Sequence, residues 1–112
     1  MIIPNADSAV VDIRKLRDYC LDATHDEGKH KAYLFATILG MSAEDADDLR
    51  AILLRVVKIH DARLGRRDEY GQRYIIDFEM EWHGRRAIIR SGWIVEHQSR
   101  VPRLNAEGHI DA

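Results

Sequence analysis

Residues 68–95, DEYGQRYIIDFEMEWHGRRAIIRSGWIV, decide the fold because apolar and charged residues alternate on both sides of His83-Gly84. A two-residue turn at His83-Gly84 fixes which residues lie opposite one another. One face then pairs mainly apolar side chains: Met80 with Ala87, Phe78 with Ile89, Ile76 with Ser91, and Tyr74 with Trp93. The other face pairs opposite charges: Glu81 with Arg86 and Asp77 with Arg90. The stretch therefore predicts an antiparallel β-hairpin with one apolar and one charged face.

The composition indicates one ordinary globular domain, residues 1–112. A chain of 112 residues suits a single core, and 46% hydrophobic with 32% charged residues is the balance of a folded protein. The net charge of −2 gives no global attraction to nucleic acid or to an anionic membrane. Any contact with nucleic acid therefore needs a local basic patch.

The cysteine count and the hydropathy favour a cytoplasmic setting. Cys20 is the single cysteine, which excludes a disulfide framework and fits a reducing compartment. It falls in an amphipathic pattern, so we expect a small buried apolar residue there. No apolar run approaches the ~20 residues that span a bilayer. The N-terminal segment MIIPNADSAV also lacks the basic part of a secretory signal.

The first half of the chain predicts helices. One helix covers residues 12–21 with Asp12 as its N-cap. A second lies within residues 25–39 and stops at Gly40. Its start is open: a capping box from Thr24 to Glu27 puts His25 in the first turn, whereas a start near Gly28 leaves His25 in the loop.

A third helix starts at Ser42, with Asp45 in a capping-box place, and frays between residues 57 and 60. Residues 61–71 predict a polar connection, with a short strand at 59–63 as an option. Residues 102–105 predict a last edge strand, and residues 106–112 are expected to fray. Near the N-terminus, residues 1–9 predict an irregular lead-in, and Val10-Val11 either adds a short strand or covers the core.

These elements give an α+β fold. Two to three N-terminal helices pack on one face of an antiparallel sheet of three to four strands. The helices cover the apolar face, because Ile76, Phe78 and Trp93 need burial.

Four segments carry a family likeness: VDIRKLRDYCLDATHDEGKHKAYLF (residues 11–35), DEYGQRYIIDF (residues 68–78), Arg90-Ser91-x-Trp93, and Pro102-Arg103-Leu104. Together they resemble a bacterial family of domains of unknown function, the one labelled 6883. The family pattern is a KLRDYLL helix, His-Pro-x-Gly-x-x-Lys-Ala, a strand pair ending in Arg-Thr-x-Trp, and Pro-Arg-Leu. Asp26 stands where the family has proline, and Ser91 stands where it has threonine.

The resemblance implies no defined activity, because the family has none agreed. Its members occur alone and as tails of larger proteins, including toxin-like ones. The layout of helices followed by an antiparallel sheet is also similar to small metal-independent ribonuclease toxins of the RelE and barnase–colicin type. That second likeness is an analogy between folds.

The first candidate site is the cluster of His25, Lys29, His30 and Lys31. A cationic loop entering a helix N-terminus can hold a phosphate, and histidine can move protons near neutral pH. The alternative is a solvated basic turn in which Asp26 and Glu27 cap the helix.

The second candidate is Arg90 with Ser91, where Arg90 clamps a phosphate; the alternative is a cross-strand ion pair with Asp77. The third is the row Asp77, Glu79 and Glu81, which could bind Mg²⁺; the alternative is a solvated sheet face. The histidine spacing offers no zinc pattern, and the sequence has no phosphate-binding glycine loop and no serine-hydrolase elbow. Trp82 beside the turn is a candidate for an interface.

Two functional interpretations remain. In one, the chain is a non-catalytic binding or accessory module of a bacterial toxin-related or mobile-element system. Its partner is then a protein, such as an antitoxin, an immunity protein or a larger host protein. In the other, it is a small ribonuclease-like toxin that needs no metal or cofactor and binds RNA. His25 is then the acid/base, Ser91 orients the phosphate, and three cations stabilise the transition state: Lys31, Arg90 and Arg103.

Overall fold

The predicted hairpin is the centre of the sheet. The computed structural model describes the backbone of residues 1–111 and the side chains of residues 1–105. Strands β2 (Gly71–Trp82) and β3 (Arg85–Glu96) pair antiparallel, and each predicted pair is confirmed. His83 and Gly84 have φ of 49° and 82°. Two successive positive φ values are what a type I′ turn needs, so the turn matches the twist of the strands.

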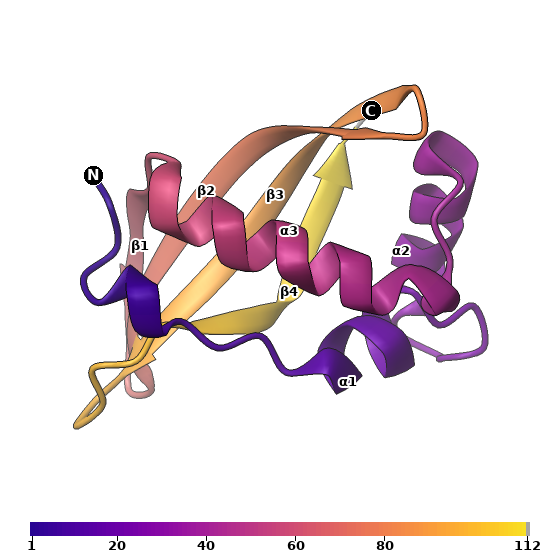
Figure 1. Cartoon of the computed structure of the whole chain (residues 1–112). Helices are drawn as coiled ribbons and strands as arrows, with labels where there is room; N and C mark the ends of the chain where they lie inside the picture. The colour runs from indigo at the N-terminus through magenta and orange to yellow at the C-terminus, as the bar shows by residue number, and fades with distance from the viewer. Residues whose placement is uncertain (112) are drawn as a thin grey trace.

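Four antiparallel strands form the sheet in the order β1-β2-β3-β4 (Figure 1). Strand β1 (Arg63–Arg67) lies inside the stretch predicted as a connection, because the preceding helix runs through Ile59 and delays the strand. Strand β4 (Arg103–Asp111) continues past the predicted end at residue 105. Its register shifts between the pairs Arg90–His109 and Gly92–Asn105.

The first helical segment begins as predicted. The Asp12 carboxylate accepts a hydrogen bond from the backbone N–H of Arg14, which caps α1 (Ile13–Lys15). The chain continues directly into a π-helical turn, η2 (Leu16–Cys20). In that turn the N–H of Leu21 reaches the carbonyl of Leu16 at 2.8 Å, five residues back. The segment therefore holds one more residue per turn than an α-helix does.

The second helix begins late. Helix α2 (Lys29–Leu34) starts after Gly28, so the structure leaves His25 in the loop. It also continues into a π-helical turn, η3 (Phe35–Leu39). Gly40 ends the helix with φ of 70°, as the sequence predicts.

The third helix follows a short 3-10 turn, η4 (Ala43–Asp45). The Asp45 carboxylate accepts from the N–H of Ser42 at 3.0 Å, and α3 (Ala46–Ile59) follows. In the lead-in, η1 (Ala6–Ser8) forms one more 3-10 turn. Val10 then bridges to Arg103 in a parallel sense, which ties the lead-in to the start of β4.

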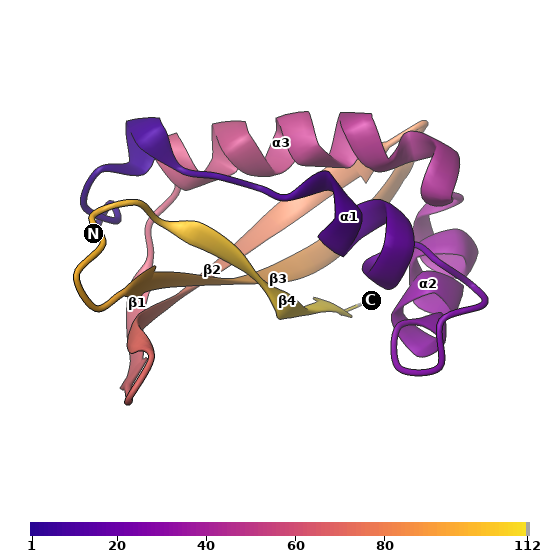
Figure 2. The same cartoon turned by 90° about the horizontal axis from the view of Figure 1, so that it is seen from below.

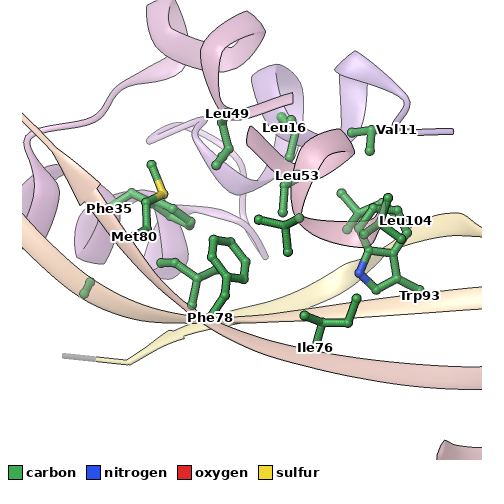
Figure 3. Packing of buried hydrophobic residues seen from close by; sticks show 14 of the residues in the cluster. Val11, Leu16, Phe35, Leu49, Leu53, Ile76, Phe78, Met80, Trp93 and Leu104 are labelled. Atoms are coloured by element: carbon green, nitrogen blue, oxygen red, sulfur yellow. The ribbon is translucent and has the colours of Figure 1, made fainter. Parts of the chain in front are cut away.

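The core lies between α3 and α1 on one side and the sheet on the other, with α2 at the end of the sheet (Figures 1 and 2). Trp93 is fully buried beside Leu104, and Phe78 packs under Leu53 (Figure 3). Phe78 and Trp93 therefore share the apolar face, as the register predicts. Over the opposite face of the sheet lies no helix of residues 1–111 (Figure 2).

Gly28 brings the second helix close to the first. A Cβ at this position would lie 2.1 Å from the carbonyl oxygen of Tyr19. No side chain fits that contact, so glycine is needed where the loop passes over η2. The contact holds the loop that carries His25 against Tyr19.

Candidate functional site

His25 and Lys31 meet at the ring of Tyr19. The imidazole of His25 lies edge-on to that ring, with 4.7 Å between the ring centroids. The ammonium of Lys31 lies 5.4 Å from the same centroid, which is within the range of a cation–π contact. The structure thus brings together two of the five predicted catalytic residues.

The imidazole of His25 closes its own loop. Its Nδ1 accepts hydrogen bonds from the backbone N–H groups of Glu27 at 3.1 Å and Gly28 at 3.0 Å. Because Nδ1 is the acceptor, the ring carries its proton on Nε2. Asp26 and Glu27 were predicted to cap the helix; the acceptor at this turn is His25 instead.

These bonds also affect the predicted phosphate site. A phosphate at a helix N-terminus binds unused backbone N–H groups. Two N–H groups just before α2 already bond to His25. Lys29 and His30 point to solvent on the first turn. The loop is therefore a hydrogen-bonded turn with exposed cations around it.

Arg90 lies on the face of the sheet that the described helices leave open. Its Nε and Nη2 donate to the two carboxylate oxygens of Asp77, at 2.8 and 3.2 Å. Arg63 approaches the same carboxylate at 3.2 Å. The hydrogen bonds from Arg90, and then the charge of Arg63, hold the pKa of Asp77 below its usual range. The predicted Arg90–Asp77 pair is present, with a second arginine added.

Ser91 lies on the other face, inside the core. It is 2% exposed, and its hydroxyl donates to the carbonyl of Ile76 at 3.0 Å. The same hydroxyl accepts from the indole Nε1 of Trp93 at 3.0 Å. To orient a phosphate beside Arg90, the hydroxyl would have to give up both partners and cross the sheet.

Arg103 belongs to a third place on the molecule. Its guanidinium pairs with Glu96 at 2.9 Å, where the start of β4 meets the end of β3. Lys15 lies close enough for the charge of Arg103 to help lower its pKa, although burial is the larger cause. The five predicted catalytic residues are thus distributed over a loop, helix α2, both faces of β3 and the start of β4.

A shallow hollow marks the open sheet face. Its volume is about 340 Å³, and Gly65 and Gly92 lie in its lining with Arg66, Arg73 and Arg90. Glycine has no side chain to stand above the sheet, so the hollow forms where β1 and β3 each carry a glycine. Three arginines lie at its margin, and each pairs with a carboxylate: Arg66 and Arg73 with Asp68, and Arg90 with Asp77.

Asp68 is a charged residue of this region that the sequence did not single out. Its carboxylate accepts from Arg73 and Arg66 and from the backbone N–H groups of Tyr70 and Gly71. The hydrogen bond from Arg73 is the main reason that the pKa of Asp68 lies far below its usual range. The sequence signal for Asp68 was its spacing from Gly71, which is typical of the turn between β1 and β2.

The row of acidic residues on β2 is paired, not clustered. Glu79 and Glu81 both lie 3.7 Å from Arg86, and Asp77 is held by its two arginines. Within the described residues no three His, Cys, Asp or Glu side chains gather as metal ligands would. Cys20 is buried, and burial raises the pKa of its thiol.

Trp82 is half-buried at the hairpin tip and stacks on His83, with 4.4 Å between the ring centroids. Its indole Nε1 is buried and has no hydrogen-bond partner in the part of the chain whose side chains are described. A buried donor without a partner is uncommon in a folded protein. Trp82 therefore stays a candidate for an interface.

Comparison with known proteins identifies a family. Residues 2–107 fit the model of a family described as a domain of unknown function, DUF6883. No curated protein and no solved structure matches the chain. The likeness to small ribonuclease toxins therefore stays a prediction. Among the described residues, no helix is both long enough and apolar enough to cross a membrane.

Proposed function

The chain belongs to the DUF6883 family, and from that premise we propose that it is a non-catalytic binding module of a bacterial toxin-related or mobile-element system. Its partner is a protein: an antitoxin, an immunity protein or a larger host protein. The occurrence of such domains as tails of larger, toxin-like proteins supports this setting. The observation that carries the proposal is the hydrogen bonding of His25.

For Nε2 of His25 to act as a base, the neutral ring must carry its proton on Nδ1. Two backbone N–H groups already point at Nδ1, so a proton there would face two donors and lose both bonds. These two bonds therefore suit a structural acceptor at Nδ1 better than a general base at Nε2.

The pairing of the cations supports the same proposal. Transition-state stabilisation needs cations directed at one phosphorus atom. Arg90 is bidentate to Asp77, and Arg103 is paired with Glu96. Paired arginines on an uncovered sheet face suit recognition of another surface, because they present both signs of charge in fixed places.

The alternative, a metal-independent ribonuclease toxin, is decided by incubating the purified protein with RNA in EDTA. The binding-module proposal expects no cleavage by the wild type. The proposal is overturned by cleavage that disappears in both His25→Ala and His25→Asn while circular dichroism shows both variants folded. His25→Asn matters here because its amide oxygen can still accept the two N–H bonds, so stability is kept while proton transfer is lost.

Binding is tested with the purified products of the neighbouring genes. We expect one of them to form a stable complex with the chain in sedimentation velocity. The double variant Arg66→Ser with Arg73→Ser, at the margin of the hollow, probes the open sheet face. Glu69→Gln on the nearby turn is its control. If no product of a neighbouring gene forms a complex with the chain, the result counts against the proposed setting.

A further inference from the structure

The sheet has a free edge on β2 next to a groove. Strand β1 pairs with β2 only as far as Ile75, opposite Arg63. The rest of β2, from Asp77 to Trp82, has β3 on one side and, among the described residues, no strand on the other. Figure 1 shows β2 running on to the hairpin tip well beyond β1. We call this segment the β2 edge.

The hairpin register decides which backbone groups face outward. In a two-residue hairpin the residues next to the turn, Trp82 and Arg85, exchange backbone hydrogen bonds, and every second pair repeats this. Asp77, Glu79 and Glu81 fall between these pairs. Their N–H and C=O groups therefore point to the β2 edge, where a further strand could use them.

A groove of about 140 Å³ runs along the same edge, and apolar side chains share its lining with Arg55, His60 and the two carboxylates of the edge. Helix α3 supplies one wall with Ile52, Val56 and Ile59, and β2 supplies the floor with Phe78 and Met80. Ile59 is 65% exposed although it ends the apolar stripe of α3. A strand laid on the β2 edge would place every second side chain in this groove and against Ile59.

The other side chains of such a strand would meet carboxylates. On the open face, Glu79 and Glu81 share one cation, Arg86, at 3.7 Å from each. On that face the carboxylates exceed the arginine that pairs with them by one, whereas Arg55 of α3 lies on the groove side of the edge. A second copy of this chain would pair β2 with β2 and place Glu79 opposite Glu79 or Glu81, which like charges disfavour.

We infer that the β2 edge accepts an extended segment of a protein partner in which apolar and basic residues alternate, by strand addition. The apolar residues enter the groove between α3 and β2, and the basic residues lie beside Glu79 and Glu81. The inference rests on the proposed binding function and names the chemistry of the partner.

The test uses synthetic eight-residue peptides and fluorescence anisotropy with the full chain. One peptide alternates Lys and Val, a second alternates Glu and Val, and a third has the Lys and Val residues in blocks. A fourth is the alternating Lys and Val peptide with N-methyl groups on one hydrogen-bonding side. We expect only the first to bind, because it alone combines alternation, positive charge and free N–H groups.

The matched variants exchange charge on the edge. Glu79→Lys combined with Glu81→Lys should lower the affinity for the alternating Lys–Val peptide by about tenfold, since two charge pairs change sign. The same double variant should let the Glu–Val peptide bind. Asp26→Lys combined with Glu69→Lys makes the same change of charge on exposed loops elsewhere and should leave both affinities unchanged. Both double variants alter exposed side chains, and circular dichroism checks that each is folded.

Three results overturn the inference: equal binding of the alternating and block peptides, binding that survives N-methylation, or no binding of any peptide. These outcomes differ from failure of the proposed function. If the chain is a nuclease, it cleaves RNA in the test above; if it has no partner, it forms no complex in sedimentation velocity. A binding module that uses another surface passes those tests, and its complex is unaffected by Glu79→Lys with Glu81→Lys.

Discussion

The indole of Trp93 and the hydroxyl of Ser91 form a polar pair inside the core. The Nε1 of Trp93 donates to the Ser91 hydroxyl at 3.0 Å, and the hydroxyl donates onward to the carbonyl of Ile76. Trp93 is fully buried, so its only polar atom depends on this partner for a hydrogen bond within the core.

The first prediction follows from that pair. Ser91→Ala should lower the free energy of unfolding by about 1–3 kcal/mol, because it leaves the indole N–H buried without an acceptor. Ser91→Thr keeps a hydroxyl and should cost less. Urea unfolding followed by tryptophan fluorescence measures both. Equal losses in the two variants would mean that volume, not the hydrogen bond, sets the cost.

The two faces of the hairpin should differ in their effect on stability. Trp93→Ala should cost about 3–5 kcal/mol as a truncated buried aromatic residue. Arg90→Ala removes an ion pair whose arginine side chain is 41% exposed, and should cost about 0–1 kcal/mol. Chemical denaturation of both variants gives the comparison, and similar losses would contradict it.

His25 should be replaceable by another acceptor. His25→Ala should destabilise the protein by about 0.5–2 kcal/mol, the usual cost of losing a cap. His25→Asn should recover most of that loss, because its side-chain oxygen can accept from Glu27 and Gly28. Thermal unfolding of the two variants measures the difference. No recovery by asparagine would count against the acceptor role.

Acidic pH should remove the contribution of Asp68 to the stability of the fold. Its pKa is lower in the folded state than in the unfolded chain, so the carboxylate stabilises the fold above the ordinary carboxyl pKa of about 3.9. That stabilisation is lost as the pH falls below this value towards the folded pKa. Asp68→Asn should therefore be less stable than wild type at pH 7, with the gap shrinking in acid. Urea titrations at several pH values test this, and Glu69→Gln on the same turn is the control.

Two glycines of the hairpin should respond differently to alanine. Gly71 has φ of 155°, and a Cβ there would lie 2.2 Å from the carbonyl oxygen of Val95. Gly84 has φ of 82° with nothing within 4 Å of such a Cβ. Both changes introduce backbone strain of about 1–3 kcal/mol, and Gly71→Ala adds a clash with backbone. Its loss of stability should be clearly the larger; the reverse order would mean that β3 yields at Val95.

The hairpin could be predicted because its two faces carry independent patterns that agree on one register. Phe78 with Ile89 and Asp77 with Arg90 both require the turn at His83-Gly84. Strand β1 has no such pattern: Arg63–Arg67 is mostly exposed and gains its form from pairing with β2. Pairing with a neighbouring strand is a tertiary effect that the alternation within one segment does not report.

The candidate site was less accessible from the sequence. The register already placed Ser91 opposite Ile76 on the apolar face, but not its bond to Trp93, which depends on the rotamer of a buried indole. The sequence put His25 in a loop or a first turn without indicating which ring nitrogen would accept. Side-chain direction within a loop is set by close contacts such as that of Gly28 with Tyr19.

The two π-helical turns, η2 and η3, have a consequence for the evolution of chain length. Each holds one residue more than an α-helical turn over the same rise, and each ends at a fixed contact: Leu21 bonds back to Leu16, and Gly40 closes η3. Deleting one residue from either segment would convert it to an α-turn while the helix that precedes it, α1 or α2, kept its place. Family members with a gap of one residue in these stretches would therefore keep this fold, whereas the same gap in β2 or β3 would reverse the faces of the sheet.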